Sequence, residues 1–365
     1  MQYSQKCFMK TTFVNIPTIE VPIAASPGFA KKGLSDFKLD IVGLCQFGCV
    51  YCSSNEGNYL RINRKKFAKL TKKQTGVGSL PAEDPQLMFL WPEIIERLEK
   101  QLAKVGPDFG AGKTLVFSML TDGFSPYLVQ TGTTEKALRM VLEKTQFRIR
   151  ILTKNSIVGK PKWIDFFKSF PGRFVVGLSI GTMDNAWAKN VELRTSPPSS
   201  RLIAMQLLQD AGIATYGMLC PVFPEVLDGD HLERLVESIR PDRVEDFWAE
   251  PYYSPNDWRE LLKAVPVGSA THKLLTNAFE KKQRGVWSRY ATDLYLRLRA
   301  IAERDGWIHK LKYLLYETDI IPTDAVQFGD MEGVLLQSKP NEDGTSKNPA
   351  FAAIPRRSAK RRRRK

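Results

Sequence analysis

Three cysteines, Cys45, Cys49 and Cys52, lie within eight residues at the spacing C-x3-C-x2-C. They follow the apolar run from Phe37 to Leu44, whose composition predicts a β-strand. A short loop of thiols after a strand is suited to bind metal. Three thiolates satisfy three irons of a [4Fe–4S] cluster and leave the fourth iron without a protein ligand. That iron can hold a small chelating ligand, so the spacing indicates a cluster that does chemistry as well as carrying electrons.

Two simpler interpretations of these thiols are a zinc site and a set of unrelated cysteines. Structural zinc is usually held by four Cys or His ligands. After Cys52 the chain contains neither residue type until Cys220, so a nearby fourth zinc ligand is missing. The spacing therefore favours the iron–sulfur cluster.

The composition is that of a folded protein of the size of many enzymes. The chain has 365 residues, of which 43% are hydrophobic, enough for one large α/β domain with additions. It contains no run of 18 apolar residues, so we expect no membrane contact. The first ten residues lack an apolar signal core, and the five cysteines are an odd number, which argues against secretion and a disulfide framework. We therefore expect a cytoplasmic location, where a reducing environment suits an oxygen-sensitive cluster.

The net charge of +15 is concentrated in two segments. Arg61–Lys73 carries seven positive charges and the C-terminal Arg356–Lys365 carries eight, so the rest of the chain is neutral on balance. Such basic runs suit a polyanion, most simply DNA or RNA. For the last ten residues the alternative is a solvated tail without a partner.

From residue 37 onward, strand and helix patterns alternate. Apolar, β-branched strands joined by helices are typical of a parallel sheet. We expect strands at 37–44, 113–120, 147–152, 173–180, 213–219 and 244–249, and helices at 91–105, 133–144, 161–170, 198–211 and 228–239. Six such units predict an α/β fold in the form of an incomplete parallel (β/α)6 barrel. A complete eight-fold barrel is not expected, because clear alternation ends near Glu250.

Changes in composition divide the chain into four parts. We expect an irregular N-terminal lead-in over 1–36 and the barrel over 37–250. An aromatic-rich, mixed extension follows over 251–336, with a helix near 288–305 and a strand near 311–316. Residues 337–365 are rich in polar and charged residues, which predicts a disordered basic tail.

Polar or reactive side chains lie at the C-terminal end of each predicted strand. In parallel barrels chemistry takes place at this rim, because the ends of all strands meet there. A polar group at every strand end is better evidence for a site than one such residue would be. The set comprises Cys45, Thr121, Asp122, Thr153, Lys154, Ser179, Cys220 and Glu250.

These motifs resemble those of known proteins. The cysteine spacing, with Tyr51 just before the last cysteine, resembles that of the radical S-adenosylmethionine (SAM) enzymes. Further segments are similar to the spore photoproduct lyase family, often called DNA-repair-photolyase-like, over about residues 37–250. The segments that carry this resemblance are Thr121–Tyr127, Ile151–Asn155, Ser179–Asp184, Glu192, Pro197, Arg201, Ala211–Ile213 and Leu219–Asp228.

The resemblance implies roles for individual residues. The three cysteines would bind a [4Fe–4S] cluster, whose free iron would hold SAM. Thr121 and Asp122 would lie beside the methionine part of SAM, where a carboxylate can accept from its ammonium. Lys154 would pair with the SAM carboxylate, and Ser179 would bond its ribose or carboxylate. The simpler alternatives are an exposed loop lysine and a capped strand end.

The chain departs from the family at its hydrogen-donating groups. True spore photoproduct lyases carry a cysteine two residues before the Ser-Asp pair, and this chain has Met119 there. They also carry a tyrosine just past the third cluster cysteine, where this chain has Ser53 and Ser54. Repair of the spore thymine dimer is therefore not expected. Cys220 is a candidate substitute donor, although a free cysteine is more often a small buried apolar residue.

Three functions remain open from the sequence. The leading hypothesis is a radical SAM enzyme that takes electrons from an external donor and abstracts hydrogen from a nucleic acid, in repair or modification. A second is the same chemistry on a protein or small molecule. A third is a nucleic-acid-binding protein whose cluster is structural or senses redox state. The polar strand ends argue against the third, since a structural cluster needs no SAM pocket.

Overall fold

The computed structural model describes residues 11–56, 64–81, 83–253 and 258–352. Of the two basic segments, Arg61 and all of Arg356–Lys365 lie outside these residues. No helix of the described part is both long and apolar enough to cross a lipid bilayer.

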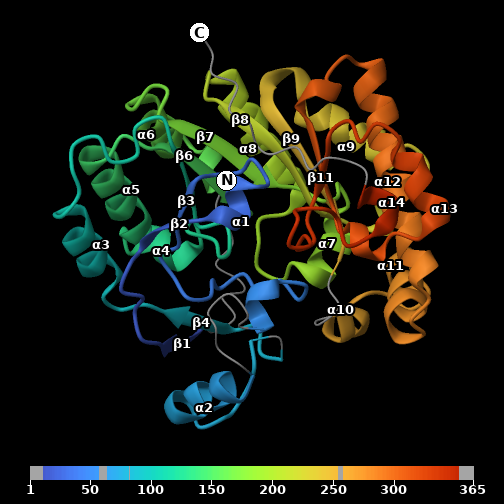
Figure 1. The fold of residues 1–365 in the computed structure, drawn as a ribbon. Helices are drawn as coiled ribbons and strands as arrows, with labels where there is room; N and C mark the ends of the chain where they lie inside the picture. Colours follow the sequence, from blue (N-terminus) through green and yellow to red (C-terminus); the bar gives the residue numbers. More distant parts are fainter. Residues whose placement is uncertain (1–10, 57–63, 82, 254–257, 353–365) are drawn as a thin grey trace.

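A nine-stranded sheet forms the centre of the described structure (Figure 1). Its strands are β2 (Ile23–Ala25), β3 (Phe37–Leu39), β5 (Thr114–Phe117), β6 (Arg148–Thr153), β7 (Phe174–Ser179), β8 (Thr215–Val222), β9 (Val244–Pro251), β10 (Leu311–Leu315) and β11 (Val334–Leu336). The order is β11-β10-β9-β8-β7-β6-β5-β3-β2, and only the β2–β3 pair is antiparallel. The mostly parallel sheet confirms the predicted α/β class.

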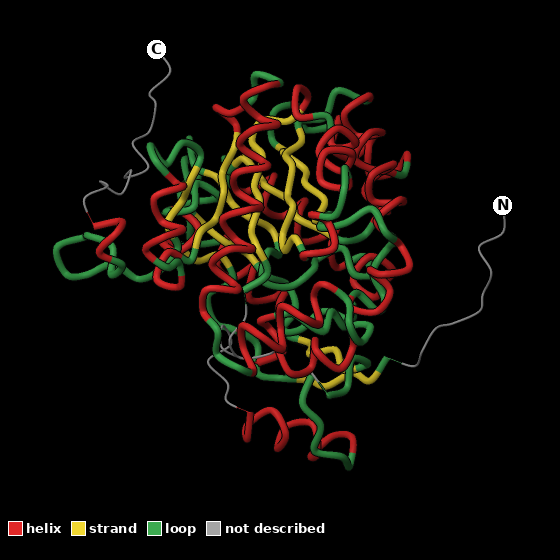
Figure 2. Tube along the Cα trace, turned by 90° about the vertical axis from the view of Figure 1, so that its right-hand side faces the viewer, coloured by secondary structure: helices red, strands yellow, loops and turns green. Residues whose placement is uncertain are grey.

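Helices connect the parallel strands and pack on the sheet (Figures 1 and 2). They are α1 (Pro27–Ala30), α3 (Ile94–Leu102), α4 (Pro126–Gln130), α5 (Thr133–Lys144), α6 (Pro161–Lys168), α7 (Asn185–Val191), α8 (Pro198–Asp210), α9 (His231–Ile239), α10 (Trp258–Ala264), α11 (Ala270–Leu274), α12 (Arg284–Arg304), α13 (Pro322–Ala325) and α14 (Pro349–Ala352). Shorter 3₁₀ turns are η1 (Ser53–Glu56), η2 (Ser156–Gly159), η3 (Pro224–Leu227), η4 (Pro241–Arg243), η6 (Ile308–Lys310), η7 (Glu317–Asp319) and η8 (Val326–Phe328), and η5 (Leu275–Glu280) is a π-helical segment.

Burial explains why these segments take these forms. All six residues of β7 are buried, as expected for a central parallel strand covered on both faces. Helix α5 buries Ala137, Leu138 and Val141, which share one face at helical spacing, while its charged residues lie outside. Sequence periodicity of these two kinds is what allowed the alternation to be predicted.

The sheet continues beyond the six predicted strands. The extension supplies β10, which pairs with β9, and β11, which pairs with β10. Four of the five residues of β10 are buried, because α12 packs on this end of the sheet. The six predicted strands are therefore present as β3 and β5 to β9 within a longer sheet, and their closure into an incomplete barrel stays a prediction. The first strand, β3, is also shorter than predicted, and the buried residues 40–44 continue it as irregular chain.

A second, two-stranded sheet lies beside the main one. It is formed by β1 (Thr12–Asn15) and β4 (Leu87–Leu90), which run parallel. A single bridge joins Leu44, just before the first cysteine, to Phe89 of β4. Helix α2 (Arg64–Thr75) packs on β1 and projects from the body (Figures 1 and 2).

Part of the predicted disordered tail is ordered. Residues 337–352 return to η7, where the buried Glu317 carboxylate accepts from the Ser338 amide at 3.1 Å and the Ser346 hydroxyl at 3.3 Å. The Asn348 side chain donates to the Glu317 carbonyl at 2.7 Å. Polar composition predicted disorder, but here the polar side chains satisfy a buried carboxylate. Residues 353–365 lie outside the described part.

Candidate active site

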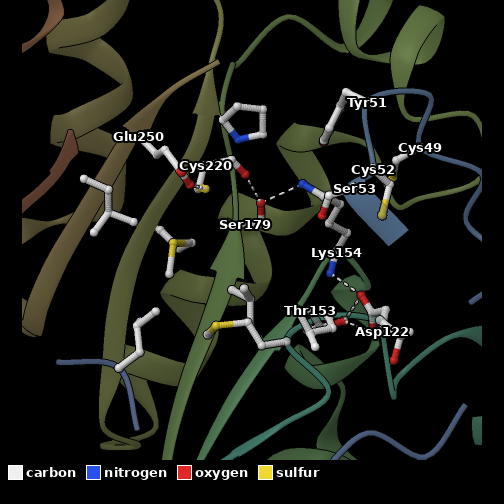
Figure 3. A pocket seen from close by; sticks show the side chains of 18 of the residues that line it. Cys49, Tyr51, Cys52, Ser53, Asp122, Thr153, Lys154, Ser179, Cys220 and Glu250 are labelled. Carbon is white, nitrogen blue, oxygen red and sulfur yellow. Dashed lines mark hydrogen bonds between the residues drawn. The ribbon is translucent and has the colours of Figure 1, made fainter. Parts of the chain in front are cut away.

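A cavity of about 350 Å³ lies at the C-terminal edge of the parallel strands (Figure 3). The cysteine loop lines one side, and residues at or just after the ends of β5 to β9 line most of the rest. Residues near α1 and at or just after β10 complete the lining: Phe29, Lys32, Leu34, Leu314 and Tyr316. Such a volume is within the range of small-molecule sites. Every residue that the sequence assigned to the site lines this one cavity: Cys45, Cys49, Tyr51, Cys52, Thr121, Asp122, Lys154, Ser179 and Cys220.

The cysteine loop is held by its own backbone. The Cys52 amide donates to the Cys49 carbonyl at 3.1 Å, and the Asn55 side chain donates to the same carbonyl at 2.9 Å. Gly48 has a φ of +62°, and a Cβ there would lie 2.8 Å from the Pro85 carbonyl oxygen. Only glycine fits this combination of left-handed backbone and close approach.

The environment of the thiols fits a metal cluster. Burial, with the charges of Cys52 and Asp122, raises the pKa of the Cys45 thiol to about 12. Burial also raises the pKa of Cys49 well above its ordinary value, and the Glu192 charge adds to this effect. Thiolates at these positions therefore need cations beside them, and cluster irons are such cations.

A single-ion site is a poorer description of the same residues. Within the described residues, no three or more His, Cys, Asp or Glu side chains gather as ligands of one ion. In a four-iron cluster each thiolate binds a different iron, so the thiols must face a shared space and not a shared atom. The three cysteines do line one cavity.

Asp122 ties two strand ends together. Its carboxylate accepts from the Thr153 hydroxyl at 2.9 and 3.0 Å, from the Lys154 amide at 2.7 Å and from the Phe124 amide at 2.9 Å. Burial raises the pKa of Asp122 to about 6, against the opposing effect of these donors. Neighbouring Thr121 donates its hydroxyl to Asp40 at 3.1 Å.

Lys154 belongs to a buried polar network. Its ammonium lies 2.6 Å from the Ser179 hydroxyl and 2.9 Å from the Glu192 carboxylate. Glu192 also accepts from the Arg201 guanidinium and the Tyr51 hydroxyl. Burial raises the pKa of Glu192, but the Lys154 and Arg201 charges outweigh it and hold the pKa at about 2. Lys154 is therefore a positioned, paired cation and not a loose loop lysine.

Glu192 and Arg194 lie two residues apart, but they do not pair with each other. The structure instead pairs Glu192 with Lys154 and Arg201. Arg194 donates to the Pro85 carbonyl on the other side of the cysteine loop. Glu192 and Arg201 are both among the positions that resemble the spore photoproduct lyase family. That resemblance could not show which cations pair with the Glu192 carboxylate.

A second network surrounds Cys220. The Cys220 thiol lies 2.6 Å from one oxygen of Glu250, and the Tyr316 hydroxyl donates to the other at 2.7 Å. The Tyr253 ring stacks on Tyr316 with centroids 4.2 Å apart. Burial and the Glu250 charge raise the pKa of the Cys220 thiol well above its ordinary value, so it is a protonated S–H. Both tyrosines line the cavity, and sequence reasoning missed them.

The residues at the two positions where the family carries hydrogen-donating groups lie in or beside the cavity. Met119 and Ser53 line the cavity, and Ser54 is buried with its hydroxyl directed to the Leu120 carbonyl. A thioether has no S–H to donate. Within the described lining, Cys220 is thus the one cysteine outside the C-x3-C-x2-C motif.

Comparison with known sequences gives distant matches. No family model matches the chain. The uncharacterized protein ORF301 of Acidianus two-tailed virus is 24% identical over 199 residues, which cover 54% of this chain and 60% of that protein. The uncharacterized protein MJ0683 of Methanocaldococcus jannaschii is 25% identical over 118 residues, covering 32% and 44%. The matches span less than two thirds of either relative.

Similar solved structures include spore photoproduct lyase, the family that the sequence motifs resemble. A complex of that enzyme with dinucleoside spore photoproduct aligns over 70% of this chain and 66% of that one, with 14% identity and a TM-score of 0.42. Streptococcus suis SuiB bound to SAM aligns over 67% and 44%, with 11% identity and a TM-score of 0.35. Likeness at this level carries no argument about activity, which has to come from the site.

Proposed function

We propose that this protein is a radical SAM enzyme. The observation that carries the proposal is the single cavity in which the C-x3-C-x2-C thiols face the polar ends of five neighbouring strands. Neither the thiols nor the polar strand ends would support the proposal alone, because three thiols can be structural and polar strand ends occur in many parallel sheets. Together they provide three cluster ligands and a polar pocket for a small charged molecule.

In this proposal Cys45, Cys49 and Cys52 hold a [4Fe–4S] cluster. A [4Fe–4S] cluster held there would supply the electron for reductive cleavage of SAM, which is the chemistry that starts hydrogen abstraction from a substrate. The chain's contribution is to bind and orient SAM and to exclude water from the cavity.

Lys154 and Asp122 are the groups proposed to orient SAM. The Lys154 ammonium has three donors, two of which face Ser179 and Glu192, so a third can reach a ligand carboxylate. Asp122 has both oxygens engaged with Thr153 and backbone amides. A fixed carboxylate of this kind is suited to accept from the SAM ammonium without moving.

Cys220 is the proposed hydrogen donor to the substrate radical. In that step the S–H bond breaks, a C–H bond forms, and the sulfur is left as a thiyl radical. The thiyl radical regains the thiol by taking one electron from the external electron donor and one proton. Glu250 and Tyr316 lie beside the sulfur, and they offer a path for that proton.

The test is anaerobic reconstitution with iron and sulfide, followed by chemical reduction, addition of SAM and quantification of 5′-deoxyadenosine. Wild-type protein should bind about four irons and form 5′-deoxyadenosine. The triple change of Cys45, Cys49 and Cys52 to Ala should lose both properties. Cys220→Ala is the matched control and should keep the iron. A loaded, reducible cluster that never cleaves SAM would overturn the proposal.

The proposed substrate is a nucleic acid, as the two basic segments suggest. Arg61–Lys73 and Arg356–Lys365 together account for the net charge of +15. The same cleavage assay, run with and without DNA or RNA, tests this choice. Stimulation by one polymer would support it, whereas formation of 5′-deoxyadenosine that no polymer changes would favour a protein or small-molecule substrate.

A further inference from the structure

Helix α2 has two opposite faces, and the inner one is packed against the small β1–β4 sheet. Phe67 is buried and lies against Phe89 of β4, with ring centroids 5.0 Å apart. Thr71 is also buried, and the Gln74 side chain exchanges two hydrogen bonds with the backbone of Asn15 in β1 at 2.9 and 2.7 Å. Contacts from both ends of the helix thus fix its orientation on the small sheet.

The outer face of α2 carries a row of lysines. Lys65, Lys69, Lys72 and Lys73 are exposed, and their spacing of four, three and one places them within an arc of about 100° on the helix, opposite Phe67. We call these four residues the α2 lysine face. No acidic residue occurs in α2 to balance them.

Such a face is unfavourable for the free helix. Like charges three or four residues apart on a helix repel each other and destabilise it. Lys65 also lies in the first turn, where the helix dipole disfavours a cation. Lys72 and Lys73 lie in the last turn, where the dipole favours cations, so dipole effects alone do not explain the whole row. A bound polyanion would convert this repulsion into attraction.

The location of α2 links it to the cavity. The helix packs on the β1–β4 sheet, and β4 bridges to Leu44, the residue before Cys45. The cysteine loop and the α2 lysine face are therefore fixed to the same small sheet. In both views α2 projects beyond the rest of the body, where a long polymer can reach it (Figures 1 and 2).

We propose that the α2 lysine face binds the phosphate backbone of a nucleic acid and holds the polymer next to the cavity. From Lys65 to Lys73 the helix rises about 12 Å, which corresponds to three or four phosphates at the strand spacing of about 3.4 Å. An anionic membrane fits less well. Amphipathic helices bind membranes through an exposed apolar face, and the apolar Phe67 side of α2 is covered by protein. This inference deepens the proposed function by assigning its polymer-binding surface.

The test is a salt titration of binding to a labelled DNA duplex, measured by fluorescence anisotropy with the full chain. The variant replaces all four residues of the α2 lysine face with Gln. The matched control replaces four exposed lysines of α3, α5 and the turn after α3 with Gln: Lys100, Lys104, Lys136 and Lys144. Both variants lower the net charge equally, so a difference between them reports position and not total charge. Equal melting temperatures establish that both are folded.

Each phosphate contact contributes about −0.9 to the slope of log K against log salt. If all four lysines contact phosphate, the slope of the α2 variant should be less steep than wild type by about 3.6, and that of the control variant should match wild type. Over a fourfold change in salt this difference in slope corresponds to about a 150-fold change in relative affinity. Equal slopes for the two variants would overturn the inference. The same variants are also tested for binding to vesicles of anionic lipid, and an α2 variant that loses vesicle binding but keeps wild-type DNA binding would overturn it as well.

This assay needs neither iron nor SAM, so its result is separate from the test of the enzyme. A protein that binds DNA through α2 but never cleaves SAM would keep the inference about the surface and refute the proposed enzyme.

Discussion

Replacing Glu192 with Gln should destabilise the protein strongly. Glu192 is almost buried, with 8% of its side chain exposed, and its carboxylate meets Lys154, Arg201 and the Tyr51 hydroxyl. Arg201 is buried to 1% exposure and Lys154 to 15%. Because both cations are shielded from water, losing the shared carboxylate leaves them charged and poorly paired.

The size of the effect follows from those two contacts. Glutamine has nearly the volume of glutamate, so no cavity forms and only the electrostatic part changes. A hydrogen bond to a charged group is worth about 1.5–3 kcal/mol, and two such bonds are weakened here. Removing one partner of a buried ion pair typically destabilises by about 3–5 kcal/mol. We therefore expect the free energy of unfolding to fall by about 3–5 kcal/mol.

Urea unfolding of the metal-free protein, followed by circular dichroism, measures this change. Glu135→Gln is a close control, because Glu135 also meets two cations, Arg139 at 3.0 Å and Lys162 at 2.8 Å. Those cations are 48% and 68% exposed, so the control should lose no more than about 1 kcal/mol. If Glu192→Gln is no more destabilising than Glu135→Gln, the buried network is not the support for the site that we infer.

Three further changes test other parts of the site. Gly181→Ala should lower the melting temperature, because its Cβ would lie 2.1 Å from the Pro221 carbonyl oxygen; an unchanged melting temperature would contradict this close packing. Lys154→Met should weaken SAM binding to the reconstituted protein about 10- to 100-fold in calorimetry, the loss of one charged hydrogen bond. Unchanged affinity would remove Lys154 from the SAM site. Tyr316→Phe should lower the free energy of unfolding by about 1.5–3 kcal/mol, since it removes a hydrogen bond to Glu250, and a neutral result in urea unfolding would argue against that bond.

Much of the fold was predictable because the pattern of burial is local. Helix α5 begins and ends at the predicted residues, 133 and 144, because its apolar spacing and its boundaries are both visible in the sequence. The first strand was predicted too long. Residues 41–44 are apolar and buried as they would be in a strand, but the buried Asp40 before them accepts a hydrogen bond from Thr121, and this contact cannot be seen in local sequence.

The last two strands of the sheet show the limit of pattern reasoning more clearly. β10 was expected as a strand, but its place beside β9 depends on pairing with residues more than 60 positions earlier. β11 is only three residues long and gives almost no periodic signal. Likewise, the polar residues after β11 suggested disorder, since nothing nearby showed that they surround Glu317.

The candidate site was predictable to the extent that it depends on strand ends. One geometric rule, that parallel strands end at the same edge, was sufficient to collect the cysteines and the polar residues in one cavity. The rule says nothing about which groups pair within the cavity. It therefore missed the role of Glu192 between two cations, and it missed Tyr253 and Tyr316, which enter from the extension.

The pairings divide the cavity into two chemically different sides. Lys154, Ser179 and Asp122 form a side with fixed charges, in which each group is held by at least one neighbour. Cys220 and Tyr316 form the other side. There the thiol and the phenol hydroxyl each carry an exchangeable hydrogen, and both donate to the Glu250 carboxylate. The first side is suited to hold a charged cofactor still, and the second to supply a hydrogen atom. The two sides adjoin at Ser179, whose hydroxyl donates to the Cys220 carbonyl at 2.8 Å. Under the proposed function, hydrogen abstraction and hydrogen return would therefore take place within one small cavity.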